Sequence, residues 1–158
     1  MMRIGIGYDV HAFVSDRPLI LGGIQIPHSK GLLGHSDADV LTHAIMDAIL
    51  GALALGNIGT FFPDSDPRFK DINSLHLLAE VIKKMDEKKY KIGNVDSVLI
   101  CENPKLNPHI LAIRTSLANA LGISLDQLGL KATTSEKMGF LGREEGIACQ
   151  SIVLLESI

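Results

Sequence analysis

The sequence lacks any long apolar run. No stretch reaches the roughly 18 consecutive apolar residues that a membrane-spanning helix needs. The opening residues, MMRIGIGYDVH, acquire polar groups too early for the apolar core of a signal peptide. We therefore expect a cytoplasmic protein.

Cysteine and positive charge are also scarce. The two cysteines, Cys101 and Cys149, lie far apart among apolar neighbours. Such residues are usually buried free thiols, and we assign them no chemistry. The formal net charge is -3, and no basic stripe interleaves with aromatic residues. Because that stripe is the usual mark of nucleic-acid binding, we expect no nucleic-acid partner.

Nothing in the sequence divides the chain into parts. It contains no internal repeat, low-complexity tract or linker, and its 158 residues suit one domain. Hydrophobic residues make up 46% and charged residues 21%, which is typical of a folded globular protein. We expect a single domain over residues 1–158.

Apolar periodicity predicts strands and helices in turn. The predicted strands cover residues 3–10, 95–104, 128–136 and 146–156, with a hairpin over 18–27. The predicted helices cover residues 37–55, 74–88 and 109–122. The first helix should begin with a capping box of Ser36 and Asp39 and stop at Gly56. This order implies an α/β (α+β) sandwich, a mainly β sheet with helices packed on one face.

The motif GYDVHAF places Asp9 and His11 two residues apart, where the first strand is expected to end. Residues i and i+2 of a strand face the same side. His43, on the first helix, lies off the apolar stripe, and we expect it on a polar surface ridge with aspartates four residues before and after it. Together the three side chains would leave one open position, as in catalytic zinc sites. The alternative is a chance Asp-x-His pair and an ordinary helix histidine.

Other polar groups suit phosphate chemistry. His35 and Ser36 precede the first helix, whose free N–H groups attract anions. The motif FFPDSD offers two carboxylates, and KATTSEK offers a basic group, three hydroxyls and Glu136. Hydroxyls suit phosphoryl oxygens, and carboxylates suit divalent cations. Taken singly, Ser36 is also explained as a helix cap and His35 as a surface residue, and the two later motifs are better explained as a polar strand end and a surface loop.

The order and wording of these motifs resemble the 2-C-methyl-D-erythritol 2,4-cyclodiphosphate synthase family of the non-mevalonate isoprenoid pathway. The similarity covers nearly the whole chain, in the segments GIGYDVHAF, GLLGHSDADVLTHAIMDAILGALALGNIG, FPDSDP, GNVDSVLICENPK and KATTSEKMGFLGREEGIAC. It implies a metal-dependent phosphorus-oxygen lyase acting on 4-diphosphocytidyl-2-C-methyl-D-erythritol 2-phosphate. An oxygen of the 2-phosphate would attack the β-phosphorus, giving the cyclic diphosphate and CMP.

The same resemblance implies roles for individual residues. The implied metal ligands are Asp9, His11 and His43 for zinc, and Glu136 for magnesium or manganese bound with the substrate diphosphate. The implied catalytic residues, which steady phosphate charge, are His35 and Thr134. The implied substrate contacts are Ser36, Asn57, Ile58, Gly59, Phe62, Pro63, Asp64, Ser65, Asp66, Cys101, Pro104, Lys105, Leu106, Ala132, Thr133, Ser135, Phe140 and Arg143. Residues 57–59 and 62–66 would surround the methylerythritol, and residues 101–106 with 132–133 would take the cytidine.

The resemblance also implies an assembly. The family is a homotrimer with active sites at subunit interfaces, so one protomer would supply the zinc and its neighbour the cytidine pocket. Phe140 and Arg143 match residues near an axial channel that would take an isoprenoid diphosphate. Three residues depart from the family pattern: Asn57 stands in place of aspartate, Ala38 in place of a common glycine, and Gln150 in place of a glutamate facing the axis.

Two other functions remain open at this point. A zinc-dependent phosphodiesterase would activate water at the open position and give a linear product. A metal-stabilised nucleotide-binding module would need four protein ligands and no open position.

Overall fold

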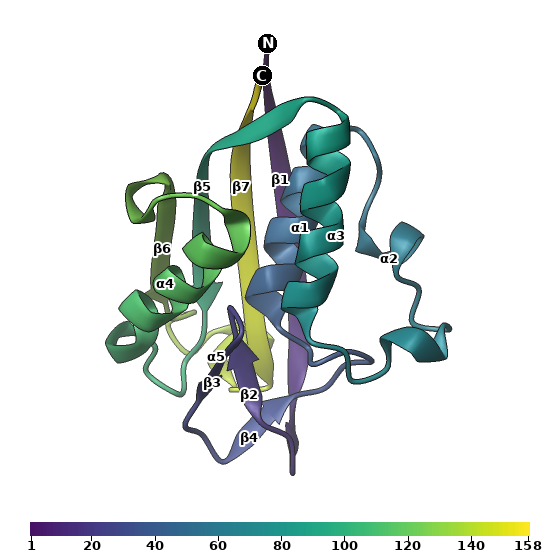
Figure 1. Cartoon of the computed structure of the whole chain (residues 1–158). Helices are drawn as coiled ribbons and strands as arrows, with labels where there is room; N and C mark the ends of the chain where they lie inside the picture. The colour runs from purple at the N-terminus through teal and green to yellow at the C-terminus, as the bar shows by residue number, and fades with distance from the viewer.

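The computed structural model describes all 158 residues and has a five-stranded sheet with its main helices on one face (Figure 1). The strands follow the order β4-β1-β7-β5-β6. Their bounds are β1 Met2–Ser15, β4 Lys30–Leu32, β5 Tyr90–Ile100, β6 Leu128–Thr133 and β7 Gly146–Ser157. Only β5 and β6 are parallel, and the other neighbours are antiparallel. This confirms the expected mixed α/β architecture.

A separate hairpin, β2 (Leu19–Leu21) and β3 (Ile24–Ile26), turns at Gly22 and Gly23 as predicted. Both glycines have positive φ, which a tight turn requires and other residues rarely adopt.

Helix α1 (Val40–Ala52) lies directly on β1. Alternate β1 residues face the helix, and two of them are the glycines Gly5 and Gly7. A Cβ atom at Gly5 would lie 1.9 Å from the carbonyl oxygen of Ala48, and one at Gly7 would lie 1.9 Å from that of Ala44. The helix backbone therefore rests on the strand where no side chain intervenes, and this contact fixes its distance from β1.

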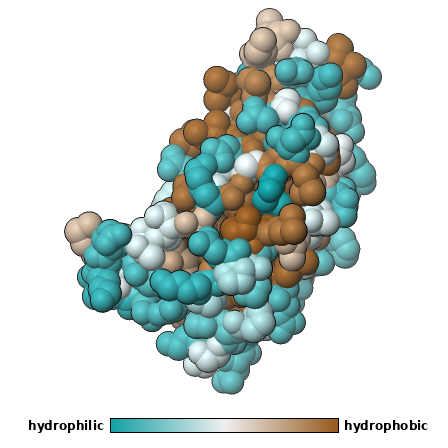
Figure 2. Space-filling view, turned by 90° about the vertical axis from the view of Figure 1, so that its left-hand side faces the viewer, coloured by the Kyte–Doolittle hydropathy of each residue, from teal (hydrophilic) through white to brown (hydrophobic).

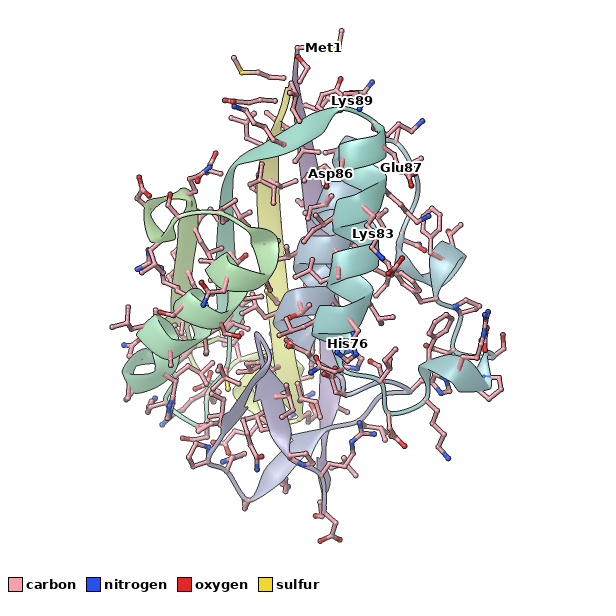
Figure 3. All side chains as sticks on the ribbon, viewed as in Figure 1. Met1, His76, Lys83, Asp86, Glu87 and Lys89 are labelled. Atoms are coloured by element: carbon pink, nitrogen blue, oxygen red, sulfur yellow. The ribbon has the colours of Figure 1, made fainter.

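Helices α3 (Ser74–Glu87) and α4 (Ile110–Leu121) complete the helical layer. On α3 the residues Lys83, Asp86 and Glu87 are exposed, and their side chains extend from the outer side of the helix (Figure 3). The opposite side of α3 contributes leucine, valine and methionine side chains to one continuous core between the sheet and the helices. Gly122 ends α4 in the left-handed conformation, as the sequence predicts.

Two predicted boundaries are wrong in ways that affect the site. Strand β1 continues to Ser15, so Asp9 and His11 lie within the strand and not at its end. Helix α1 begins at Val40, and its N-cap is Asp39, whose side chain accepts the Thr42 N–H. The expected capping box with Ser36 is therefore absent. The helix ends at Ala52, before Gly56. Ala54 already has a left-handed φ of 58°, which an α-helix does not allow.

Short elements were not predicted. They are β4, α2 (Ile58–Phe61), α5 (Gly139–Gly142), and single turns of 3-10 helix at Pro67–Phe69, Asn107–His109 and Leu125–Gln127. Three or four residues are too few to show an apolar period. Both cysteines are buried free thiols, as expected, and burial raises the pKa of each to about 12. None of the helices has the length and apolar character that crossing a membrane requires.

Candidate active site

Three potential metal ligands converge where α1 meets β1. Nε2 of His11 lies 2.9 Å from Oδ2 of Asp9, and Nδ1 of His43 lies 3.1 Å from the same oxygen. The two ring nitrogens are 3.3 Å apart. These are the three residues that the sequence nominates, and the structure brings them together.

The ring orientation of His11 is fixed by a backbone carbonyl. Its Nδ1 lies 2.8 Å from the oxygen of Leu33. Because a carbonyl oxygen can only accept, Nδ1–H is the donor. In the neutral ring Nε2 then presents a lone pair toward Asp9 and His43, and in the protonated ring Nε2–H donates to Asp9. This is the usual arrangement around a metal-binding imidazole.

The Asp9 carboxylate and the His11 imidazole shift each other's pKa. Burial alone would raise the pKa of Asp9, but its polar contacts with His11 and His43 outweigh it and lower that pKa to about 2. Burial alone would lower the pKa of His11, but the hydrogen bond and charge of Asp9 outweigh it, so that pKa lies above its ordinary value of 6.5. The carboxylate is therefore ionised at neutral pH, as a metal ligand must be.

The polar ridge expected around His43 is not a surface ridge. His43 is only 6% exposed, and Asp39 is fully buried. Asp39 accepts the backbone N–H groups of Gly22 and Gly23 and so fastens the β2-β3 hairpin to the start of α1. Asp47 accepts the N–H of Ile58. Neither aspartate belongs to the metal-ligand cluster.

The donor set fits a divalent metal ion. One ligand atom from each of Asp9, His11 and His43 lies within 4.8 Å of the other two. Two imidazole nitrogens and one carboxylate oxygen form a set that zinc accepts, and three protein ligands leave a fourth position open. The site has the composition of a catalytic metal centre and lacks the four ligands of a structural one.

The three ligands open into a cavity of about 520 Å³. Its lining residues are Asp9, His11, Leu33, Gly34, His35, Ser36, His43, Ile58, Gly59, Phe62, Pro63 and Asp64. The sequence nominates all of these except Leu33 and Gly34. A Cβ atom at Gly34 would lie 3.2 Å from the His11 ring, so a small residue is needed there. A glycine beside a candidate histidine is the signal that sequence reasoning could have used.

His35 and Ser36 line this cavity, but not in the expected way. The N-terminus of α1 begins four residues after Ser36, and the carboxylate of Asp39 already accepts its Thr42 N–H. The carboxylate of Asp39 therefore already takes one of the first-turn N–H groups that an anion could have used. The Nε2–H of His35 donates to the carbonyl oxygen of Asp66 at 2.9 Å, which leaves Nδ1 of the ring for other partners.

A second, smaller cavity of about 130 Å³ lies where β5 and β6 end. Its lining residues are Cys101, Lys105, Leu106, Asn107, Ala132, Thr133 and Thr134. All but Asn107 are sequence candidates. Strands β1 and β6, which carry parts of the two cavities, are separated in the sheet by β7 and β5.

The remaining candidates line neither cavity. Asn57 caps α2 by accepting the Thr60 N–H, and Asp66 forms an ion pair with Arg68. The others outside both cavities are Ser65, Pro104, Ser135, Glu136, Phe140 and Arg143. Ala38 has a φ of +57°, a conformation that favours glycine and matches the departure noted at this position.

Comparison with known proteins gives consistent results. The model of the YgbB family matches residues 2–156. A 2-C-methyl-D-erythritol 2,4-cyclodiphosphate synthase from Desulfitobacterium hafniense is 58% identical over 158 residues, covering all of both chains. One from Clostridium acetobutylicum is 60% identical over 154 residues, covering 98% of this chain and 99% of the relative.

Solved structures agree over the same length. A CDP-bound 2C-methyl-D-erythritol-2,4-cyclodiphosphate synthase is 38% identical, with a TM-score of 0.90 and coverage of 98% of this chain and 100% of that one. The bifunctional IspDF from Campylobacter jejuni is 42% identical, with a TM-score of 0.96, and this chain spans 43% of it. The resemblance read from the motifs therefore extends to the whole fold.

Proposed function

We infer the function from the premise that this chain belongs to the YgbB family, with which it shares residues 2–156. It converts 4-diphosphocytidyl-2-C-methyl-D-erythritol 2-phosphate to 2-C-methyl-D-erythritol 2,4-cyclodiphosphate and CMP, a step of non-mevalonate isoprenoid biosynthesis. The observation that carries this conclusion is full-length identity near 58% to named synthases, together with the Asp9, His11 and His43 cluster. Residues 1–158 would act as one cyclodiphosphate synthase domain.

The reaction is a phosphorus-oxygen lyase step that needs no side-chain nucleophile. Phosphoryl transfer depends mainly on positioning and on stabilising charge. Bound zinc would supply a Lewis-acidic positive charge beside the substrate phosphates. Asp9, His11 and His43 would hold it, and Glu136 would hold magnesium or manganese with the diphosphate. His35 and Thr134 would steady phosphate charge, and Ser36 would donate to a phosphate oxygen.

The large cavity suits the methylerythritol part of the substrate. Asp64 lines it and offers a carboxylate that can accept hydrogen bonds from two hydroxyls. Phe62 and Pro63 supply apolar contact. Asn57, Ser65 and Asp66 would act from the rim, since they flank the lining residues in sequence.

The small cavity suits the cytidine. Cys101, Lys105 and Leu106 from one segment face Ala132 and Thr133 from another. Two relatives of known structure are described as CDP complexes, which supports a cytidylylated ligand. Pro104 and Ser135 adjoin the cavity in sequence and would complete it.

We propose a homotrimer, because one protomer does not join the two cavities. β1, which bears Asp9 and His11, and β6, which bears Ala132 and Thr133, are three strand positions apart, roughly 14 Å at the usual strand spacing. A neighbouring protomer could set its small cavity against the large one. The face of the sheet that carries no helix supports this assembly, since it exposes Ile4, Ile6, Tyr8, Val10 and Ile152. Apolar residues also gather on the side that bears α4 and β6 (Figure 2).

Such a homotrimer would enclose a channel along its three-fold axis. Phe140 is exposed on α5, and Arg143 pairs with Glu145 at 2.9 Å. We propose that they contact an isoprenoid diphosphate there, with Gln150 in place of an acidic residue. Calorimetry with geranyl diphosphate would test it, and the absence of heat at protein concentrations well above micromolar would count against it.

Phosphorus NMR tests the reaction itself. Incubation with the cytidylylated substrate, zinc and magnesium should give CMP and a cyclic diphosphate. A linear product or inorganic phosphate would indicate the phosphodiesterase instead. Binding of nucleotide with no turnover would indicate a binding module, although the three-ligand cluster already argues against the four-ligand site that such a module needs.

A further inference from the structure

On the side of its ring away from Asp9, His43 contacts a chain of two polar residues, Ser74 and Asp37. Its Nε2 points away from Asp9 and lies 2.9 Å from Oγ of Ser74, the first residue of α3. Ser74 has no exposed surface. Its hydroxyl contacts the Asp37 carboxylate, and its backbone N–H donates to Oδ2 of Asp37 at 2.9 Å. Asp37 belongs to the segment before α1, so two separate elements meet behind this ring.

The direction of the hydrogen bonds in this chain follows from its chemistry. An ionised carboxylate can only accept, so the single hydroxyl proton of Ser74 goes to Asp37. Oγ of Ser74 is then left with lone pairs toward His43. Nε2 of His43 must therefore carry the hydrogen and donate, and Nδ1 keeps its lone pair on the side of Asp9.

The opposite tautomer of His43, with the hydrogen on Nδ1, would also be stabilised by its neighbours. Nδ1 of His43 lies 3.1 Å from Oδ2 of Asp9, which would readily accept a proton from it. Oγ of Ser36, 3.2 Å from Nε2, could then donate to the ring from the other side. In that state Nδ1–H would point into the metal position, and the lone pair needed for coordination would be lost.

We propose that Ser74 and Asp37 are positioning residues that hold His43 as the Nε2–H tautomer and so keep Nδ1 ready to bind the metal ion. The proposal deepens the proposed function and rests on the metal centre assigned there. It gives His43 the same kind of support that the Leu33 carbonyl gives His11. It also leaves the hydroxyl proton of Ser36 free to donate to a phosphate oxygen. Such partners behind a ligand typically contribute about 10–100-fold to metal affinity.

Zinc affinity, measured by competition with a chromophoric chelator, tests the proposal without any turnover assay. Ser74→Ala and Asp37→Asn should each weaken zinc binding about 10–100-fold. Asp71→Asn is the matched control, because Asp71 is an exposed carboxylate near Asp37 that contacts neither Ser74 nor His43. It should bind zinc like the unsubstituted protein.

The double variant tests whether Asp37 and Ser74 act on His43 through one hydrogen-bond chain or independently of each other. If Asp37 acts through the Ser74 hydroxyl, Asp37→Asn should cause little further loss of zinc affinity in a Ser74→Ala background. Losses that multiply, or single variants with unchanged affinity, would overturn the proposal. If the unsubstituted protein itself fails to bind zinc at micromolar concentration, the metal centre of the proposed function fails instead.

A measurement on the unsubstituted protein remains decisive even if the variants do not fold. Nitrogen NMR of the zinc-loaded protein should show His43 coordinated through Nδ1, with a slowly exchanging Nε2–H. Coordination through Nε2, or an Nε2–H that exchanges as fast as that of an exposed imidazole such as His76, would overturn the proposal.

Discussion

Oδ2 of Asp9 and Nδ1 of His43 lie 3.1 Å apart, although 34 residues separate them in the sequence. The contact depends on how closely α1 approaches β1. The carbonyl oxygen of Ala44, the residue after His43, lies against Gly7, two residues before Asp9. The candidate metal centre is therefore built on a backbone-to-backbone contact.

Gly7→Ala should disrupt this contact. The new methyl group would lie 1.9 Å from the Ala44 carbonyl oxygen, so the helix must move away from the strand. We expect a loss of about 3 kcal/mol in the free energy of unfolding, at the upper end for overpacking, and loss of zinc binding. Chemical denaturation and chelator competition would measure both effects.

Gly51→Ala is the matched control, in the helix that packs against Gly7. A methyl group there meets nothing closer than 3.6 Å, and alanine favours helix over glycine. We expect a change between zero and about 1 kcal/mol in favour of the folded state. Equal destabilisation by both substitutions would contradict the role given to the Gly7 contact.

His43→Ala should abolish turnover, because it removes one of three metal ligands. The loss should exceed the roughly 100-fold that removal of a supporting residue causes. The protein should still fold, at a cost of about 1–3 kcal/mol, since the buried hydroxyls behind the ring lose a partner. His76→Ala, an exposed histidine on α3, should change neither property (Figure 3). Retained activity of His43→Ala in metal-depleted buffer would refute the metal-dependent mechanism.

Acid should weaken the metal-free fold through Asp9. Its pKa is lowered from 3.8 to about 2 on folding, so its stabilising effect is present above 3.8 and is lost as the pH falls toward about 2. The stability difference between the unsubstituted protein and Asp9→Asn should shrink across this window.

The contribution of His11 to the stability of the metal-free fold has the opposite pH dependence. Its pKa is raised above 6.5, so its contribution to the metal-free fold is present below 6.5 and is lost as the pH rises through the raised value. Protons also compete with metal for the ring, so zinc affinity should fall as the pH drops below that value. Zinc affinity that is constant down to about pH 4.5 would argue against histidine ligation.

Lys105→Ala should weaken cytidine binding more than it slows the reaction. Lys105 lines the small cavity and supplies its only cationic side chain. We expect about a 10-fold rise in the Michaelis constant and in the dissociation constant of CDP, in line with one charge-assisted hydrogen bond. Lys131→Ala, which breaks a surface ion pair with Asp96 on the nearby strand, is the control. An unchanged Michaelis constant would reject this role.

Mixing two impaired variants should raise activity above that of either variant alone if sites form between protomers. His43→Ala keeps an intact small cavity, and Lys105→Glu keeps an intact metal centre. After dissociation and reassembly of an equal mixture, about one quarter of the interfaces should combine the two intact halves. Activity that never rises above that of the separate variants would place the whole site within one chain.

Much of the fold could be predicted from the sequence, because long strands and helices show a recognisable spacing of apolar residues. The strand 146–156 and the helix 74–88 match β7 and α3 within one residue at each end. The three-ligand cluster was also found, since Asp9 and His11 share a strand face and His43 stands off an apolar stripe. The family was identified from the order of whole motifs.

The tertiary structure decided what periodicity cannot reveal. Ser36 looked like a helix cap, but Asp39 takes that place, and its carboxylate also accepts the N–H groups of Gly22 and Gly23 in the β2-β3 hairpin. The ridge of His43 looked exposed, but Ser74 of α3 lies against the His43 ring and the β2-β3 hairpin lies against Asp39. Local sequence determines which side chains are available and which face they share. Only the packing of distant elements determines which of them are buried and which hydrogen bonds they make.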